Sequence, residues 1–277
     1  MIKRLLTIQD VSCVGQCSAT VALPVVSACG VECAVLPPAI LSNHTGGFAS
    51  WTFADLTDEM PKIERKWIEH GIRFDAFYTG YVCESHIDPI LSISKTCAKE
   101  GALRIVDPAM ADNGVLYAGF APDFPSKMAR LCAGADYVLP NLTEAALLAG
   151  REPKLSGATR DEIEALVADM HALGARNVIL TGVSFSPDEL GTAVSDGNTV
   201  RYDFNPRNPR SSHGTGDVFA SVFAGAVLRG MPAFDAAALA ADIVCEAIGA
   251  TDLGHWYGVS FERTIPSIAK AFRGMPE

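Results

Sequence analysis

The chain has 277 residues, of which 49% are hydrophobic and 19% are charged, and its formal net charge is −10. A chain of this composition can bury a sizeable core, so wholesale disorder is excluded. The acidic balance argues against a nucleic-acid or anionic-membrane partner, because neither polyanion would be attracted to it. Every apolar run is shorter than the roughly 18 residues that a membrane-spanning helix needs.

The start of the chain combines two basic residues with a short apolar run that stops before Asp10. A signal peptide needs a longer apolar stretch and a small-residue cleavage site, so we expect a first strand here and a soluble protein of the cytoplasm. The eight cysteines should then stay reduced. Cys13 and Cys17, like Cys29 and Cys33, are four apart, but no second ligand pair follows at zinc-site spacing. We expect small buried hydrophobic side chains instead.

Short β-branched runs alternate with helical stretches along most of the chain. Strands are expected at 5–8, 31–36, 76–80, 103–107, 137–139 and 177–181, and helices at 17–28, 55–71, 87–100, 127–133 and 159–173. This alternation predicts a mostly parallel sheet with helices on both faces and ligands beyond the carboxyl ends of its strands. A β-hairpin is expected at 191–204, turning at 196–198, and buried helices at 218–228 and 236–248. With no linker or repeat in the sequence, we expect one domain over 1–277; a TIM barrel fits the hairpin and the helical last third poorly.

The segment Gly214-Thr215-Gly216-Asp217 precedes the apolar helical run. Two glycines around a threonine let backbone N–H groups converge, and the helix N-terminus adds about half a positive charge. This arrangement suits a transferring phosphoryl group, and Asp217 in the first turn could accept a hydroxyl proton. The spacing alone leaves an ordinary Gly-rich loop equally open. The Walker pattern is absent, so a P-loop enzyme is excluded.

With the Val-Phe-Ala that follows it, the segment 214–217 resembles the signature of the ribokinase-like superfamily, and within it the pyridoxal (vitamin B6) kinases. Further segments resemble theirs in the expected order, at 5–9, 41–46, 79–81, 107–112 and 140–145. The resemblance implies a three-layer α/β/α sandwich with a mostly parallel central sheet. It also implies ATP-dependent phosphorylation of the 5′-hydroxymethyl group of pyridoxal, pyridoxine or pyridoxamine by a Mg²⁺-dependent homodimer.

The same resemblance assigns roles in phosphoryl transfer. Asp217 would be the catalytic base, and Gly214, Thr215 and Gly216 would form the anion hole through their backbone N–H groups. The hydroxyl of Thr215 has no assigned role.

For the nucleotide, the resemblance implies that Asp107 and Glu144 hold Mg²⁺ against the ATP phosphates, directly or through water. Asn141 would contact a phosphate or a metal-bound water, and Asp112 matches a position linked with a monovalent cation. Thr181 and Gly182 would meet an ATP phosphate. A capping box between Glu144 and Asn141 is an alternative that is compatible with these roles.

For the vitamer, Thr45 and Tyr81 are the implied contacts, and His44 could either bind it or hold its loop. One departure concerns Asp10, which stands where B6 kinases have the serine of a Gln-Ser-His segment. A serine hydroxyl can donate a hydrogen bond, whereas an ionised aspartate can only accept one. Asp10 therefore predicts a preference for pyridoxamine or pyridoxine over the aldehyde, unless it merely caps the neighbouring turn.

Three rival functions remain open. Hydroxymethylpyrimidine kinases of thiamine synthesis share the fold but commonly carry Cys where Asp217 stands. Sugar and nucleoside kinases usually carry a lid strand insertion and a Gly-Gly pair near the N-terminus. The Gly46-Gly47 pair of this chain does not stand in that setting. A catalytically silent nucleotide-binding protein is disfavoured by the intact Asp217, Asp107 and Glu144.

Overall fold

The computed structural model describes residues 2–210 and 212–275. The chain divides into two compact units, the first formed by Met1–Leu103 with Asn208–Glu277 and the second by Arg104–Arg207. The first unit thus joins both ends of the chain, and the second is one continuous segment. The expectation of a single domain over 1–277 stays a prediction.

The sheet of the first unit carries the opening strand at its centre. Strand β1 (Arg4–Ile8) pairs in parallel with β3 (Glu32–Leu36) on one side and β6 (Phe74–Thr79) on the other, and β7 (Ala98–Val106) begins beside β6. Leu5, Leu6 and Ile8 are fully buried, as expected for a parallel strand covered on both faces. A smaller sheet contains β2 (Val11–Ser12), β4 (Ala39–Leu41) and β5 (Phe53–Asp55).

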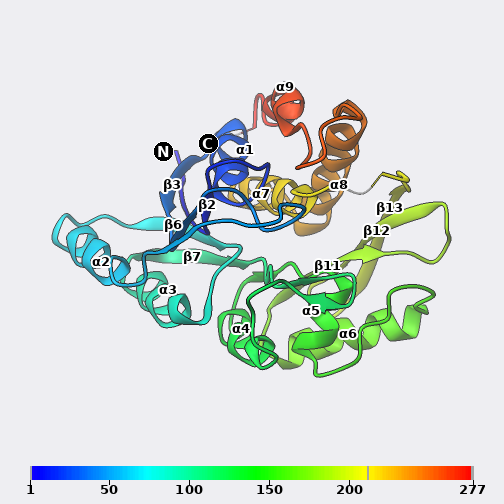
Figure 1. Ribbon diagram of the computed structural model, residues 1–277, viewed down its shortest axis with the longest axis horizontal. Helices are drawn as coiled ribbons and strands as arrows, with labels where there is room; N and C mark the ends of the chain where they lie inside the picture. The colour runs from blue at the N-terminus through cyan, green and yellow to red at the C-terminus, as the bar shows by residue number, and fades with distance from the viewer. Residues whose placement is uncertain (1, 211, 276–277) are drawn as a thin grey trace. The chain divides into compact units, whose positions relative to one another are not determined.

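Helices cover both faces of the first unit's sheet (Figure 1). One group comprises α1 (Ala19–Ala28), α7 (Thr215–Leu228), α8 (Ala233–Ala250), a 3₁₀ turn (Phe261–Thr264) and α9 (Ile265–Ala271), and the other α2 (Met60–Glu69) and α3 (Glu84–Thr96). Every residue from Val218 to Leu228 is buried, which confirms the expected buried helix. Within the described residues, no helix is long and apolar enough to cross a membrane.

The second unit combines parallel and antiparallel strands. The end of β7, β10 (Tyr137–Val138) and β11 (Asn177–Val183) are parallel, and β12 (Glu189–Ser195) and β13 (Val200–Pro206) extend the sheet antiparallel. The predicted hairpin is confirmed, and Asp196 Oδ1 accepts from the N–H groups of Asn198 and Thr199 at its turn. The unit also contains β8 (Ala111–Asp112), β9 (Val115–Leu116), α4 (Phe124–Cys132), α5 (Leu142–Leu148) and α6 (Arg160–Ala172).

Some predicted boundaries were wrong. Residues 98–100 were expected in a helix, but α3 ends at Thr96 and they begin β7. Phe74 N donates to Cys97 O at 2.9 Å, and Lys99 Nζ lies 2.7 Å from Asp75 Oδ2, so pairing with β6 overrides local helix propensity. Asp55 ends β5 instead of starting a helix, and the first helix begins at 19 instead of 17.

All eight cysteines are free thiols in the structure, but they are not all buried. Cys29, Cys97 and Cys132 fit the expectation of small buried side chains, whereas Cys13 is exposed in the loop that leads to α1. No group of three or more His, Cys, Asp or Glu within 2–210 and 212–275 is arranged to hold a metal ion by itself.

Candidate active site

In the first unit, the Gly214–Asp217 segment starts α7 against the loop that precedes α1. Gly214 has φ 80°, and a Cβ there would collide with the carbonyl oxygen of Gln16. A Cβ on Gly216 would meet nothing within 4 Å. Asp217 lies in the first turn, as predicted, among backbone N–H groups that a helix cannot pair internally. Gly214 is therefore required by packing, and Gly216 leaves open space beside the helix start.

The pKa of the Asp217 carboxyl group lies near neutral pH. The pKa of Asp217 is raised to about 7, chiefly by burial and to a smaller extent by the nearby Asp10, while the backbone N–H of Ser18 acts in the opposite direction. A carboxylate with a pKa near the working pH is well suited to take up a hydroxyl proton. The position and the pKa of Asp217 both fit a general base.

Asp10 lies just beyond β1 and is only 2% exposed. Its Oδ2 accepts from Ser12 Oγ at 2.7 Å. Burial raises the pKa of Asp10 and outweighs this hydrogen bond. Burial also raises the pKa of Tyr81, with smaller contributions from Cys83 and Asp10. The charge of Asp10 therefore acts on both Tyr81 and Asp217.

The predicted substrate loop is held by His44. Its Nδ1 accepts from the Gly46 N–H at 3.0 Å, so Nε2 carries the proton that is donated to Tyr257 O at 2.9 Å. Burial lowers the pKa of His44, which keeps this tautomer neutral; the Tyr257 carbonyl opposes the shift. Of the two roles left open for His44, these contacts favour holding the loop. Thr45 is half-buried beside it.

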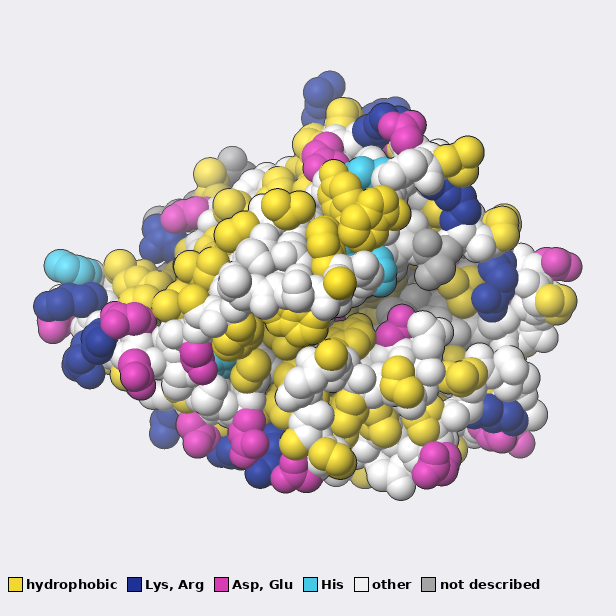
Figure 2. Space-filling view, in the orientation of Figure 1, with side chains coloured by type: hydrophobic (Ala, Val, Ile, Leu, Met, Phe, Trp, Pro, Cys, Tyr) yellow, Lys and Arg dark blue, Asp and Glu magenta, His cyan; other side chains and the backbone are white. Residues whose placement is uncertain are grey.

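Sequence reasoning missed an aromatic cluster next to this loop. Phe48 lies 4.8 Å from Trp256 between ring centroids, and His44 lies 5.2 Å from both Phe48 and His213. Trp256 is 57% exposed, and Figure 2 shows hydrophobic side chains and histidines gathered on this part of the first unit. The one sequence feature that could have indicated this cluster is His213, which directly precedes Gly214.

In the second unit, Asn141 and Glu144 form the capping box that the sequence left open. Asn141 Oδ1 accepts from Glu144 N, and Glu144 Oε2 accepts from Asn141 N, both at 2.9 Å. Glu144 Oε1 also accepts from Met110 N at 3.1 Å, and Asn141 Nδ2 donates to Ala111 O at 2.8 Å. The start of α5 thereby holds the loop that follows β7.

Carboxylates gather where β7 and β10 end. Glu144 is buried, and burial raises its pKa to about 8, with backbone N–H donors opposing and Asp112 adding a like charge. Asp107 is half-buried directly after β7, and Asp112 is exposed with Asn113 N 2.8 Å from its Oδ1. This concentration of negative charge fits a hydrated divalent cation, which needs only one or two carboxylates besides phosphates and waters.

Thr181 and Gly182, the predicted phosphate contacts, lie in the second unit as well. Thr181 forms a parallel bridge with Asn141, and its N–H donates to Pro140 O at 2.9 Å. Gly182 follows with φ 79° and is exposed. Asn141, Glu144 and Thr181 are thus neighbours.

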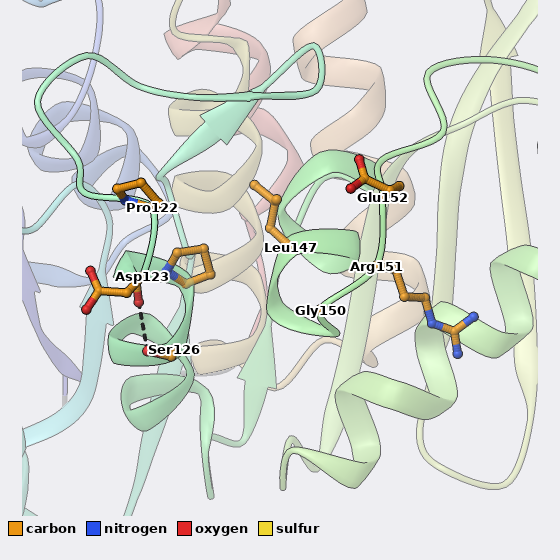
Figure 3. Close-up of a pocket in the computed structure, with 8 residues that line it drawn as sticks. Pro122, Asp123, Ser126, Leu147, Gly150, Arg151 and Glu152 are labelled. Carbon is orange, nitrogen blue, oxygen red and sulfur yellow. Dashed lines mark hydrogen bonds between the residues drawn. The ribbon is translucent and has the colours of Figure 1, made fainter.

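A hollow of ≈ 380 Å³ in the second unit lies elsewhere. It is lined by Pro122, Asp123, Pro125, Ser126, Leu147, Gly150, Arg151 and Glu152 (Figure 3). None of these is a predicted site residue. Arg151 turns out of the hollow, and its Nη2 lies 2.6 Å from Asp169 Oδ2.

Comparison with known proteins identifies the family. Residues 23–260 match the model of the phosphomethylpyrimidine kinase family, and the chain belongs to that family. The hydroxymethylpyrimidine/phosphomethylpyrimidine kinase of Rhizobium meliloti is 29% identical over 82% of this chain and 83% of its own length.

Two solved structures extend the likeness to nearly the whole chain. Pyridoxal kinase from Lactobacillus plantarum is 31% identical, with a TM-score of 0.89 over 98% of each chain. A candidate phosphomethylpyrimidine kinase from Bacteroides thetaiotaomicron, crystallised with pyridoxal, is also 31% identical, with a TM-score of 0.91 over 97% of this chain and 96% of that one. The predicted ribokinase-like α/β fold and the kinase class are confirmed.

The two glycines at the start of α7 provide a matched test of packing. Gly214→Ala should destabilise the protein by about 2 kcal/mol or more, because the new methyl group meets the Gln16 carbonyl at a left-handed φ. Gly216→Ala should leave stability unchanged or raise it by up to about 1 kcal/mol, since alanine is the better helix former. Urea denaturation of both variants would measure this, and equal stabilities would contradict the proposed packing role of Gly214.

A second prediction concerns the dependence of stability on pH. The pKa of Asp217 rises from 3.8 to about 7 on folding, so its contribution is fully favourable below about pH 4 and is lost as the pH rises through 7. Asp217→Asn should therefore gain stability over the wild type at pH 8, by up to about 4 kcal/mol, and much less at pH 4. The exposed Asp58→Asn serves as the control. A stability difference that does not change with pH would show that Asp217 titrates normally.

Proposed function

We propose that this protein transfers the γ-phosphoryl group of ATP to the 5′-hydroxymethyl group of pyridoxal, pyridoxine or pyridoxamine. The observation that carries the proposal is Asp217, a carboxylate with a pKa raised to about 7 in the first turn of α7. Gly214, Thr215 and Gly216 would supply N–H groups to the charge that develops on the phosphoryl group. The pyridoxal kinase likeness supports a vitamin B6 alcohol as the acceptor.

The vitamer would be bound by Asp10, Thr45 and Tyr81. Tyr81 offers a half-buried aromatic face for the pyridine ring, and Thr45 offers a hydroxyl for its substituents. Asp10 would face the ring nitrogen or the amine of pyridoxamine. A cationic partner there would favour the ionised form of this buried carboxyl group.

ATP and Mg²⁺ would be bound by residues of the second unit. Asp107 would hold the ion, directly or through water, and Mg²⁺ would screen the negative charge of the phosphates. Glu144 accepts hydrogen bonds from backbone N–H groups at both oxygens, so we assign it a role through water. Asn141, Thr181 and Gly182 would contact the phosphates, and Asp112 would lie near a monovalent cation. A homodimer in the cytoplasm is part of the same proposal.

Hydroxymethylpyrimidine phosphorylation is the second candidate. It is favoured by the family model and by the Rhizobium meliloti relative. Its substrate is likewise a nitrogen heteroaromatic ring with a hydroxymethyl group. Asp217, at a position where such enzymes commonly carry Cys, favours the B6 branch.

Measuring ATP consumption with four acceptors separates the two candidates. We expect turnover with pyridoxal, pyridoxine and pyridoxamine at a kcat/KM at least tenfold above that of hydroxymethylpyrimidine. Asp217→Asn should abolish turnover of every acceptor and keep ATP binding, because it removes only the base. A preference for the pyrimidine, or a fully active Asp217→Asn variant, would refute the corresponding part of the proposal.

The vitamer preference tests Asp10. We expect the wild type to favour pyridoxamine or pyridoxine, and Asp10→Ser to move the kcat/KM ratios severalfold towards pyridoxal, because a hydroxyl can donate where a carboxylate accepts. An unchanged KM for ATP would show that the nucleotide site is intact. Identical vitamer ratios in the two proteins would rule out this role.

A further inference from the structure

Residues 257–259, between α8 and the 3₁₀ turn, belong to no helix or strand and are nonetheless held firmly in the first unit. Gly258 and Val259 are buried. His255 Nδ1 donates to Gly258 O at 2.8 Å, and Phe261 N donates to Val259 O at 2.9 Å. Buried backbone groups need hydrogen-bond partners, and here regular structure does not supply them. The tertiary contacts of this segment therefore decide its conformation.

The first residue of the segment is bonded to the predicted substrate loop at 41–46. Tyr257 O accepts from His44 Nε2 at 2.9 Å, and the other ring nitrogen of His44 accepts from Gly46 N at 3.0 Å. Trp256, just before the segment, lies against the same loop, since a Cβ on Gly47 would meet its Cζ3 at 3.3 Å. The imidazole thus joins the backbone of the loop to the backbone at 257.

The next two residues contact the loop before α1 and the start of α7. Val259 N donates to His213 O at 3.1 Å, one residue before Gly214. A Cβ on Gly258 would collide with the side chain of Gln16, and the Gln16 carbonyl oxygen is the atom against which Gly214 packs. Three consecutive residues therefore contact three different parts of the candidate site in the first unit.

We propose that residues 257–259 form a strap that fixes the substrate loop relative to Gly214–Asp217, with His44 as the positioning residue that joins the loop to the strap. The proposal rests on the proposed function, in which the loop binds the acceptor and Asp217 takes up its hydroxyl proton. The strap touches no reacting atom in this scheme. It sets where the acceptor lies relative to the base, and a misplacement of about 1 Å can cost about a hundredfold in rate.

Two glycines of the same loop provide a matched test. Gly258→Ala should push the strap away from Gln16, because the new methyl group collides with that side chain. Gly254→Ala is the control, since a Cβ there would meet nothing within 4 Å. In Gly258→Ala we expect the KM for pyridoxine to rise about tenfold or more and kcat to fall, with the KM for ATP unchanged. Gly254→Ala should keep all three values.

The KM values distinguish a displaced loop from a damaged fold. Partial unfolding would lower kcat by reducing the amount of active enzyme and would leave both KM values as they are. A pyridoxine KM that is the same in Gly258→Ala and Gly254→Ala would overturn the proposal.

His44 offers a second test, which also serves if Gly258→Ala does not fold. His44→Asn keeps an acceptor at the position of Nδ1 and loses the donor to Tyr257 O, whereas His44→Gln keeps a donor near the position of Nε2. We expect the pyridoxine KM to rise about tenfold in His44→Asn, because the part-buried carbonyl loses its donor, and to rise less in His44→Gln. Equal KM values in these two variants would overturn the role of His44.

The strap can also be tested without any substrate. In ¹H–¹⁵N spectra of the full chain, Gly258→Ala should shift the Gly46 amide signal, because that N–H donates to the His44 ring that the strap holds. Gly254→Ala should leave the same signal in place. A Gly46 signal that does not move in Gly258→Ala would overturn the proposal.

These results separate the inference from the proposed function. If the Gly46 signal moves in Gly258→Ala while no vitamer is phosphorylated, the proposed function fails and the strap stands. If vitamers are phosphorylated with the same KM in Gly258→Ala and Gly254→Ala, the strap fails and the proposed function stands.

Discussion

The close approach of Gly214 to the Gln16 carbonyl is the contact on which the site of the first unit depends. It seats the start of α7 against the loop before α1, where any side chain at 214 would push the two apart. Asp217 then lies in the first turn of α7, where its pKa is raised to about 7, chiefly by burial. The absence of a side chain at Gly214 therefore permits the helix start that carries the candidate base.

The second unit uses a helix start in the same way. The Asn141–Glu144 capping box fixes the first turn of α5, and the remaining oxygen of Glu144 holds the loop after β7 through Met110 N. Here too a buried carboxyl group has a raised pKa. A cation near Glu144 or near Asp10 would favour the ionised form of that carboxyl group, which suits the proposed Mg²⁺ with phosphates in the second unit and the proposed protonated pyridine in the first.

Local patterns in the sequence predicted the features that depend on neighbouring residues. The opening strand, the hairpin at 191–204 and Asp217 in the first turn of a buried helix were all found. Tertiary contacts decided what was missed. Residues 98–100 form a strand because they pair beside β6. The ring contacts of Phe48 with Trp256 likewise join two loops that no spacing rule connects.

Transfer of a phosphoryl group to a vitamin B6 alcohol can be observed by ³¹P NMR of the product. After incubation with ATP, Mg²⁺ and pyridoxine, we expect a new phosphomonoester signal that the two protons of the 5′-methylene group split into a triplet. Loss of ATP with release of inorganic phosphate alone would contradict it. So would an ester that forms with hydroxymethylpyrimidine and with none of the three vitamers.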